Sequence, residues 1–168
     1  RRMPELPEVE GFRNVFALHG LGQKIQLERV LDERILGEIR KERLARQLKG
    51  RSFSRVHRHG KHLFADAGTT WLHLHFGMTG DLTPYGAGGD DPRFARVIFD
   101  FSNGRHLAFE DMRLFGVVDL AQSPEQFITA HGLGPDPLDE RFTLREFRKI
   151  AAGKKGAIKS LLMSQDVI

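Results

Sequence analysis

Residues 71–76 read Trp-Leu-His-Leu-His-Phe, an alternation of apolar and polar side chains. Successive side chains of a β-strand point to opposite faces, so Leu72, Leu74 and Phe76 share one face and the histidines share the other. Residues 97–101, Val-Ile-Phe-Asp-Phe, repeat the alternation. The two segments predict strands that each turn one face toward a common core.

Turn residues separate these segments from others between residues 25 and 120. Ser-Asn-Gly at residues 102–104 is typical of a hairpin turn, and His-Gly at residues 59–60 has the composition of another. Residues 85–93 contain three Gly, two Asp and one Pro, and predict a surface loop. Several short strands separated by turns favour an antiparallel sandwich or barrel. We expect about eight strands.

Helical spacing replaces this alternation near the two ends of the chain. Residues 3–7 predict a rigid extended lead-in, because Pro7 fixes its own φ and biases Leu6 away from the helical region. After Pro7, apolar residues recur every third or fourth position through Leu18, and Gly20 ends the run. The spacing predicts a helix there.

The pattern changes again at residues 132–137, which form a Pro/Gly connector. Beyond it, helical spacing returns near residues 143–150 and again over residues 157–163. The predicted fold is α+β, mainly an antiparallel β-sandwich of about eight strands flanked by helices and followed by a truncated helical segment. We expect a first domain over residues 1–131 and a second unit over residues 132–168.

Composition excludes several kinds of protein. The 168 residues include 26 Lys or Arg and 22 Asp or Glu, a net charge of +4 that is compatible with a polyanionic partner but does not identify one. The absence of Cys excludes disulfides, Cys-bound zinc, iron–sulfur clusters and a thiol nucleophile within these residues. No apolar run approaches the ~20 residues of a membrane span, and no signal peptide is evident. We expect a globular intracellular protein.

Residues 3–10, Met-Pro-Glu-Leu-Pro-Glu-Val-Glu, carry the first chemical possibility. A proline whose nitrogen is free is a secondary amine, and its attack on a sugar aldehyde carbon gives a cationic iminium that accepts electrons. Glu5 would stand beside Pro4 as an acid or base. From these residue types alone, a simple lead-in to a helix is the favoured interpretation.

The same stretch resembles the N-terminal signature of the formamidopyrimidine-DNA glycosylase and endonuclease VIII family of base-excision repair enzymes, and Leu6 is typical of the formamidopyrimidine branch. Further family motifs follow in the same order along the chain. They are Gly-Lys at 60–61, His-Phe-Gly-Met-Thr-Gly at 75–80, Ser-Asn-Gly at 102–104, Asp-Met-Arg-Leu-Phe-Gly at 111–116 and Ala-Ile-Lys at 157–159. The resemblance covers essentially the whole chain from Met3.

The resemblance implies a bifunctional enzyme. It would remove oxidised purines, formamidopyrimidines and 8-oxoguanine, from duplex DNA and cleave the abasic site by β,δ-elimination. Pro4 would be the Schiff-base nucleophile, Glu5 the acid that assists opening of the sugar ring, and Lys61 a lysine that assists catalysis near the sugar and its phosphates. Damaged double-stranded DNA would be the partner of a monomer in the bacterial cytoplasm.

The resemblance also implies DNA-binding residues. Met78, Arg113 and Phe115 would fill the space that a flipped-out base leaves in the duplex. Relatives often carry two histidines before the strand at Val97, whereas this chain has Phe94 and Arg96; Arg96 can still bind phosphate, but Phe94 cannot. A basic set near the end of the chain would bind further phosphates: Lys154, Lys155 and Lys159.

Two parts of the family are not expected in this chain. A Gly-Asn motif of the helix–two-turn–helix module and a Cys-rich zinc finger would lie beyond Ile168, so we expect no cofactor here and one structural zinc in the missing C-terminal part. Residues 1–3 precede Pro4, whose nitrogen is then an amide that cannot attack a carbon. We therefore expect the chain as written to be inactive.

Two alternatives remain open at this point. The chain could be a non-catalytic DNA-binding relative of these enzymes. It could also be a cupin-like metal protein, because His73 and His75 with Glu110 or Asp111 would make the two-histidine, one-carboxylate set that binds iron.

Overall fold

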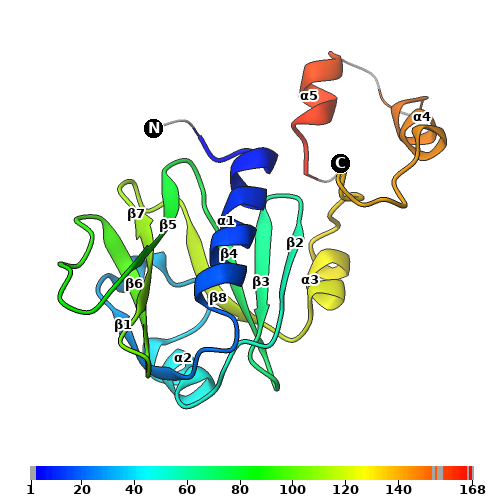
Figure 1. Ribbon diagram of the computed structural model, residues 1–168. Coiled ribbons are helices and arrows are strands. Elements are labelled where there is room, and N and C mark those ends of the chain that lie inside the picture. Colours follow the sequence, from blue (N-terminus) through cyan, green and yellow to red (C-terminus); the bar gives the residue numbers. More distant parts are fainter. Residues whose placement is uncertain (1–2, 153, 155–156, 166, 168) are drawn as a thin grey trace.

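The computed structural model describes residues 3–152, 154, 157–165 and 167. Within these residues, eight strands form two antiparallel four-stranded sheets that face each other (Figure 1), in the orders β1-β6-β7-β5 and β2-β3-β4-β8. The predicted sandwich of about eight strands is confirmed. The strands are β1 (Ile25–Val30), β2 (Val56–His59), β3 (His62–Asp66), β4 (Trp71–His75), β5 (Gly80–Tyr85), β6 (Ala95–Phe101), β7 (His106–Asp111) and β8 (Val117–Ala121).

Both predicted turns join neighbouring strands. The turn at residues 102–104 connects β6 to β7, and Gly104 there has a φ of +78°. The turn between β2 and β3 is formed by Gly60 and Lys61, one residue later than predicted, because His59 still pairs with His62. The apolar faces of β4 and β6 point into the core, as the alternation predicts. The main core cluster combines side chains of both sheets and of the helices, and a smaller cluster contains Ala95, Ile98 and Ala108.

Helix α1 (Leu6–His19) closes the open side between the edge strands β5 and β2 (Figure 1). Its buried Phe16 contacts Phe53 with ring centroids 5.1 Å apart, and Phe12 contacts Phe76 at 4.3 Å. Aromatic pairs at these distances add to the stability that burial of their area provides. The helix that carries the first motif is thereby fixed to both sheets.

The start of α1 differs from the prediction. The helix begins at Leu6, one residue before Pro7, and only residues 3–5 are extended. Proline is tolerated in the first turn of a helix because the N–H that it lacks would have no helical partner there. The Glu5 N–H donates to the Glu8 carboxylate at 3.1 Å, which satisfies the group just before the first turn.

Two further helices lie where the sequence analysis placed none. Residues 41–48 form α2 (Lys41–Leu48) within a segment where we expected strands, and residues 124–130 form α3 (Pro124–Ala130). In α2, Leu44 and Leu48 are four positions apart and both are buried, so the helix needs no other apolar residue to pack. In α3, Ser123 caps the first turn by accepting from the Gln126 N–H at 3.1 Å.

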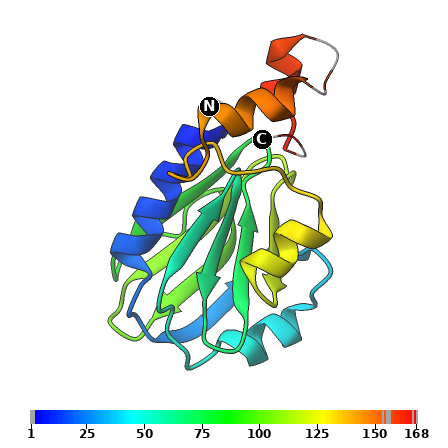
Figure 2. The same ribbon diagram turned by 90° about the vertical axis from the view of Figure 1, so that its right-hand side faces the viewer.

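Helix α3 covers the outer face of the β2-β3-β4-β8 sheet (Figure 2). Its Phe127 ring lies 4.3 Å from His73 and 3.8 Å from His131, measured between centroids. A ring nitrogen of His62 hydrogen-bonds one of His73 at 2.9 Å. Burial, with a smaller contribution from neighbouring histidines, lowers the pKa of His62 to about 2 and that of His73 to about 3.

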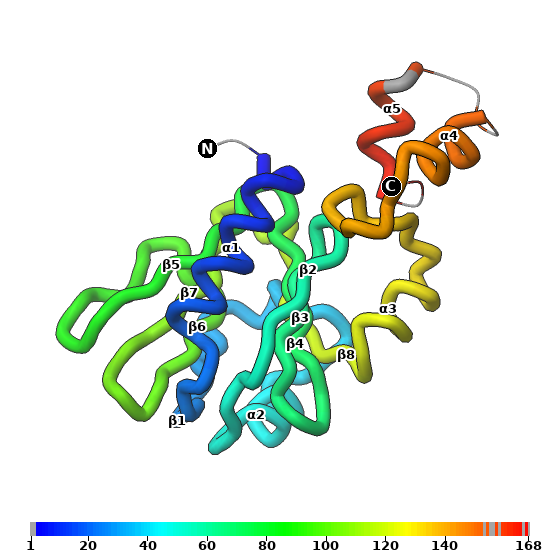
Figure 3. The backbone as a smooth tube through the Cα atoms, turned by 45° about the vertical axis from the view of Figure 1, so that its right-hand side comes forward, coloured from blue at the N-terminus to red at the C-terminus, as the bar shows by residue number. Residues whose placement is uncertain are grey.

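Beyond α3, residues 132–143 lead away from the sandwich to α4 (Leu144–Ala152) and α5 (Ile158–Leu162), which stand apart from the sheets in Figure 3. Both helices lie where helical spacing predicted them. The division of the chain at residues 131 and 132 stays a prediction. Among the described residues, every helix is too short or too polar to cross a lipid bilayer.

The buried histidines predict acid sensitivity. Their pKa values in the folded protein lie far below the ordinary value near 6.5, so on acidification the unfolded chain takes up protons first and stability falls with pH. Each histidine should cost about 2 kcal/mol of unfolding free energy between about pH 7 and about pH 5. Urea unfolding at the two pH values should show a loss that His73→Phe reduces by about 2 kcal/mol, whereas His19→Gln, outside the cluster, should leave it unchanged.

Candidate functional site

One end of the sandwich gathers three connections and the start of α1 (Figure 1). The register pairs His75 of β4 with His62 on one side and Val117 on the other, and pairs Gly80 of β5 with Asp111 of β7. The β2–β3 turn, the β4–β5 loop and the β7–β8 loop therefore leave the sheets at the same end. The predicted catalytic residues and the three predicted base-stack residues all lie on these elements.

Glu5 and Lys61 form an ion pair between the start of α1 and the β2–β3 turn. The Lys61 ammonium lies 2.5 Å from one Glu5 carboxylate oxygen, and both side chains are partly exposed. The other Glu5 oxygen is buried and has no hydrogen-bond partner among the described residues. Pro4, next in the chain, is buried. Three residues that the resemblance marked as catalytic are thus brought to one place.

Lys61 also acts on a histidine beneath it. Burial lowers the pKa of His75, and the positive charge of Lys61 lowers it further. The neutral His75 ring accepts the Gly77 N–H at 3.2 Å through its Nδ1. The base of the β4–β5 loop is therefore connected to the position of the lysine.

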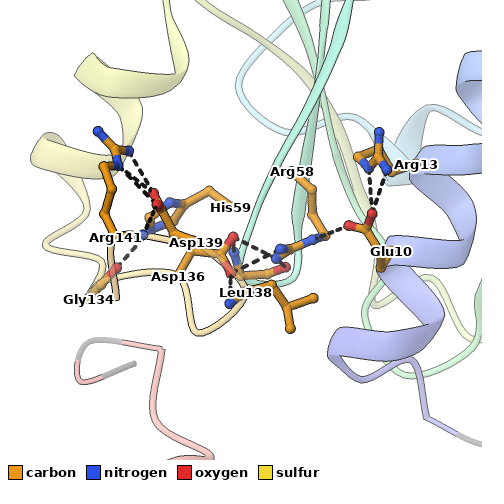
Figure 4. Close-up of polar contacts among 10 residues, drawn as sticks. Glu10, Arg13, Arg58, His59, Gly134, Asp136, Leu138, Asp139 and Arg141 are labelled. Carbon is orange, nitrogen blue, oxygen red and sulfur yellow. Dashed lines mark hydrogen bonds and ion pairs between the residues drawn. The ribbon is translucent and has the colours of Figure 1, made fainter. Parts of the chain in front are cut away.

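Arg58 fixes the turn that carries Lys61 (Figure 4). Its side chain is 5% exposed and donates to the Gly60 carbonyl at 2.9 Å, to Glu10 of α1 at 2.7 Å and to Asp136 at 2.9 Å. Asp136 in turn accepts the Gly60 N–H at 3.2 Å. The turn, the first helix and the connector after α3 are held by one guanidinium.

The charges of this Arg58 cluster are balanced within it. Burial raises the pKa of the Glu10 carboxyl, but hydrogen bonds from Arg13 and Arg58 outweigh that effect and the pKa lies below its usual value. His59 adds a second link to the connector through a 2.8 Å hydrogen bond to the Gly134 carbonyl. An open cleft of about 990 Å³ lies beside the cluster and is lined by residues of the connector and α4, but not by Glu5 or Lys61.

Asp111 holds the β4–β5 loop and the β7–β8 loop together, as Arg58 holds the β2–β3 turn. It is fully buried and accepts the Thr79 hydroxyl, the Arg113 N–H at 3.1 Å and the Gly116 N–H at 2.6 Å. Gly77 completes the junction, because its φ is +54° and a Cβ there would lie 2.4 Å from the Phe115 carbonyl carbon. The loops can approach this closely only with glycine at that position.

The predicted base-stack residues project outward from these loops. Met78 is 41% and Phe115 is 52% exposed, although both are large and apolar. Arg113 is exposed too, and its guanidinium lies 4.8 Å from the centre of the Phe115 ring. Leu114 between them has a φ of +57°, the one positive φ of a non-glycine residue among those described, and packs against the core. The strained residue faces inward while its neighbours face solvent.

The predicted phosphate-binding residues have different surroundings. Arg96 is half-buried and donates to the Asp111 carbonyl at 2.7 Å, with Asp32 3.5 Å away, so it supports the β7–β8 loop. Lys154 and Lys159 are exposed, and no ion pair with another described residue involves them. Lys155 lies outside the described residues. Nothing in the geometry joins these lysines to Lys61.

The sequence analysis missed the residues that hold the site in place. Arg58 and Asp136 were not singled out, and Asp111 was weighed only as a metal ligand. A single Arg in a strand or Asp at its end has no spacing that distinguishes a buried charge from an exposed one. Their roles depend on partners that are distant in the chain, Glu10 and Thr79 among them.

The cupin-like alternative is wrong on geometry. His73 packs beneath α3, whereas the carboxylate of Asp111 faces the loops from a strand of the other sheet. Glu110 accepts the Thr83 hydroxyl at 2.6 Å. The described part of the chain brings no three His, Asp or Glu residues into a metal-binding group, and the sequence has no Cys. The described residues therefore do not form a set of zinc ligands. The structural zinc that the family resemblance implies beyond Ile168 stays a prediction.

Comparison with known proteins identifies the family. The model of the formamidopyrimidine-DNA glycosylase N-terminal domain matches residues 3–118. The chain belongs to this family. Formamidopyrimidine-DNA glycosylase of Methylococcus capsulatus is 35% identical over 167 residues, and that of Streptococcus pyogenes is 32% identical over 168; each match covers 99% of this chain and 61% of the relative. The chain therefore spans about three fifths of the length of these glycosylases.

Solved glycosylase structures have the same fold. A Lactococcus lactis formamidopyrimidine-DNA glycosylase, non-covalently bound to DNA with an abasic site, superposes with a TM-score of 0.87 at 26% identity, over 98% of this chain and 64% of that one. MutM in complex with DNA containing carbocyclic 8-oxoguanine superposes with a TM-score of 0.87 at 27% identity, over 98% of this chain and 63% of that one.

The Asp111 junction yields a direct prediction. Asp111→Asn should cost about 1–3 kcal/mol of unfolding free energy, because an amide cannot accept all three donors and leaves one buried N–H unpaired. Both loops should also become more accessible, which hydrogen exchange at residues 77–80 and 112–116 would measure. Glu110→Gln is the matched control: an amide oxygen can still accept the Thr83 hydroxyl. Equal effects of the two substitutions would contradict a role for Asp111 in joining the loops.

Proposed function

We propose that the protein containing this chain is a base-excision repair glycosylase. It removes oxidised purines from duplex DNA and cleaves the abasic strand through Pro4. The observation that carries the proposal is the Glu5–Lys61 ion pair beside Pro4, at the same end of the sandwich as the exposed Met78 and Phe115. The names of the relatives and the damaged DNA in their solved complexes support the substrate class.

The reaction begins at the Pro4 nitrogen. When its amine is free, the lone pair forms a bond to C1′ as the bond from C1′ to the damaged base breaks, and the base leaves with a proton. The Glu5 carboxylate takes up the proton that the Pro4 nitrogen loses after the attack and donates it to the ring oxygen as the C1′–O4′ bond opens, which gives the iminium. Loss of a C2′ proton then expels the 3′ phosphate, a second elimination expels the 5′ phosphate, and water releases Pro4 from the sugar fragment.

The geometry supports the division of work between the two charged residues. One Glu5 oxygen is held by Lys61, while the other is buried without a hydrogen-bond partner among the described residues and so retains its capacity to take up a proton. The Lys61 ammonium, partly exposed, can bind a phosphate next to the lesion in the same position. The Arg58 cluster keeps both groups in place before DNA arrives, so little ordering is needed when it binds.

The exposed side chains of Met78, Arg113 and Phe115 are suited to the recognition of a damaged duplex. Extruding a base costs a few kcal/mol of lost stacking, which apolar wedges placed into the gap offset. Met78 and Phe115 provide such wedges, and Arg113 provides donors for the base that is left without its partner. Their loops are fixed by Asp111, so the wedges are preorganised.

Borohydride trapping tests the nucleophile. In the full-length protein that begins at Pro4, the iminium with abasic-site DNA should be reduced to a stable covalent complex. Retaining Met3 should abolish the complex, because the nitrogen is then an amide. Pro4→Gly, which keeps an amine at the N-terminus, should form less of it. Equal trapping with Met3 retained would mean that Pro4 is not the nucleophile, and trapping by neither form would favour a DNA-binding protein without catalysis.

The salt dependence of binding tests the loops. The chain should bind an abasic-site duplex with a Kd in the range of about 10⁻⁴–10⁻⁶ M, typical of charge-driven contacts. Phe115→Ala should weaken binding about tenfold without changing the slope against salt concentration, because stacking releases no counterions. Arg113→Ala should instead reduce the slope if it contacts a phosphate. Leu18→Ala, an exposed apolar residue of α1, should change neither the affinity nor the slope, and an equal loss there would contradict the wedge.

A further inference from the structure

The segment that contains α2 carries a marked excess of positive charge. Residues 40–51 contain six Lys or Arg and one Glu, a net charge of +5, whereas the whole chain carries +4. The rest of the molecule, including the candidate site, therefore carries a net charge of −1. Residues 141–159, which include α4, contain seven Lys or Arg and one Glu, so α2 and its two flanks form one of two strongly basic segments in the chain.

The packing of α2 leaves these cations on the outside. Leu44 and Leu48 are fully buried against the core and hold the helix, while Arg43, Arg46 and Lys49 lie on its exposed side. In an α-helix, residues three apart lie on neighbouring parts of one face, so Arg43 and Arg46 project together.

These arginines are also unpaired. The side chains of Arg40, Arg43 and Arg46 form no ion pair or hydrogen bond with any residue that the structure describes. Lys41 on the same helix, in contrast, is paired with Glu33 at 2.6 Å. The three guanidinium groups thus retain all their donors for a partner.

Helix α2 lies at the end of the sandwich opposite the candidate site (Figures 1 and 2). Strand β6 has seven residues and spans about 20 Å at roughly 3.3 Å per residue, which indicates the separation of the two ends. At physiological salt, screening limits the distance over which exposed charges interact to about 8–10 Å. The α2 surface therefore acts separately from the residues around Lys61.

We propose that the exposed face of α2, centred on Arg40, Arg43 and Arg46, binds the phosphate backbone of a second segment of duplex DNA. A protein could then hold one segment at the candidate site and a second segment at α2. The proposal does not rest on the glycosylase reaction, because contacts to phosphate need neither damage nor catalysis.

The chemistry of the face favours nucleic acid over other polyanions. A protein interface needs apolar or aromatic anchors at its centre, and both large apolar residues of α2 are turned into the core. A membrane-surface helix inserts its apolar face into lipid, which the same packing prevents. The depression that Arg40, Arg43 and Arg46 line also contains Glu38, Glu42 and the buried Ile39, so exposed charge rather than apolar area dominates this face, which suits a phosphate backbone bound by charge and paired hydrogen bonds.

The test uses undamaged DNA, so its outcome is independent of repair activity. Binding of the chain to a short labelled duplex is measured over a range of NaCl concentrations for the original chain and for Arg43→Gln/Arg46→Gln. Each lost phosphate contact lowers the slope of log K against log salt by about 0.9, so the double variant should lower it by about 2. Gln is a good helix former and both sites are exposed, so an unchanged Tm should accompany the loss.

A capture experiment tests the second segment directly. The chain bound to an immobilised duplex should retain a second, labelled duplex, and the double variant should lose this capture while still binding the first duplex. Lys41→Gln is the matched control on the same helix: its ammonium is already paired, so capture should persist and the slope should change by well under 1. The proposal would be overturned if the double variant kept the original slope of log K against log salt and still captured the second duplex. The proposal would also be overturned if the double variant lost binding to polyglutamate but still captured the second duplex, because that result would indicate an acidic protein partner.

Discussion

The candidate site depends on the bonding of Arg58. A guanidinium withdrawn from water is costly unless its donors are paired, and removing a partner from such a buried group typically costs about 3–5 kcal/mol. Arg58 satisfies this requirement with Glu10, 48 positions away in the chain, and with Asp136, 78 positions away. Because Glu10 lies one turn into α1 and Arg58 lies in β2 two residues before Gly60, the same bonds bring Glu5 to Lys61. The ion pair at the site is a consequence of a charge buried beneath it.

Asp111 shows the same principle at the other loops. A carboxylate inside the protein must be paired, and here two backbone N–H groups and the Thr79 hydroxyl provide the partners. The bonds tie down both ends of the segment that includes Leu114, whose positive φ costs roughly 1–2 kcal/mol. In both places a buried charge fixes the backbone, and the side chains that are candidates for contact with DNA lie at the surface above it.

The sequence predicts what depends on local order and misses what depends on distant partners. Alternation over residues 71–76 and 97–101 identifies two strands of the core, and the Ser-Asn-Gly turn identifies the hairpin of β6 and β7. The same reasoning fails at residues 41–48, where only Leu44 and Leu48 distinguish a packed helix from a charged loop, and at Leu6, where tolerance of proline in a first turn overrides the bias against helix. For the site, motifs identified Glu5 and Lys61, whereas no motif indicated that Arg58 or Asp111 is buried. The DNA contacts assigned to Met78, Arg96, Arg113, Phe115, Lys154 and Lys159 stay predictions.

The distribution of charge separates two tasks that a DNA repair protein must perform. Recognition of a lesion needs exact placement, and at the candidate site most charges are already paired within the protein: Lys61 with Glu5, and Arg96 with the Asp111 carbonyl. Residence on long stretches of undamaged DNA needs unpaired cations and little geometry, because counterion release does not depend on sequence. The free arginines of α2 meet that need at the opposite end of the molecule. Under the proposed function, pairing at the candidate site keeps Glu5 and Lys61 ordered, and non-specific attraction is better located where it cannot disturb them.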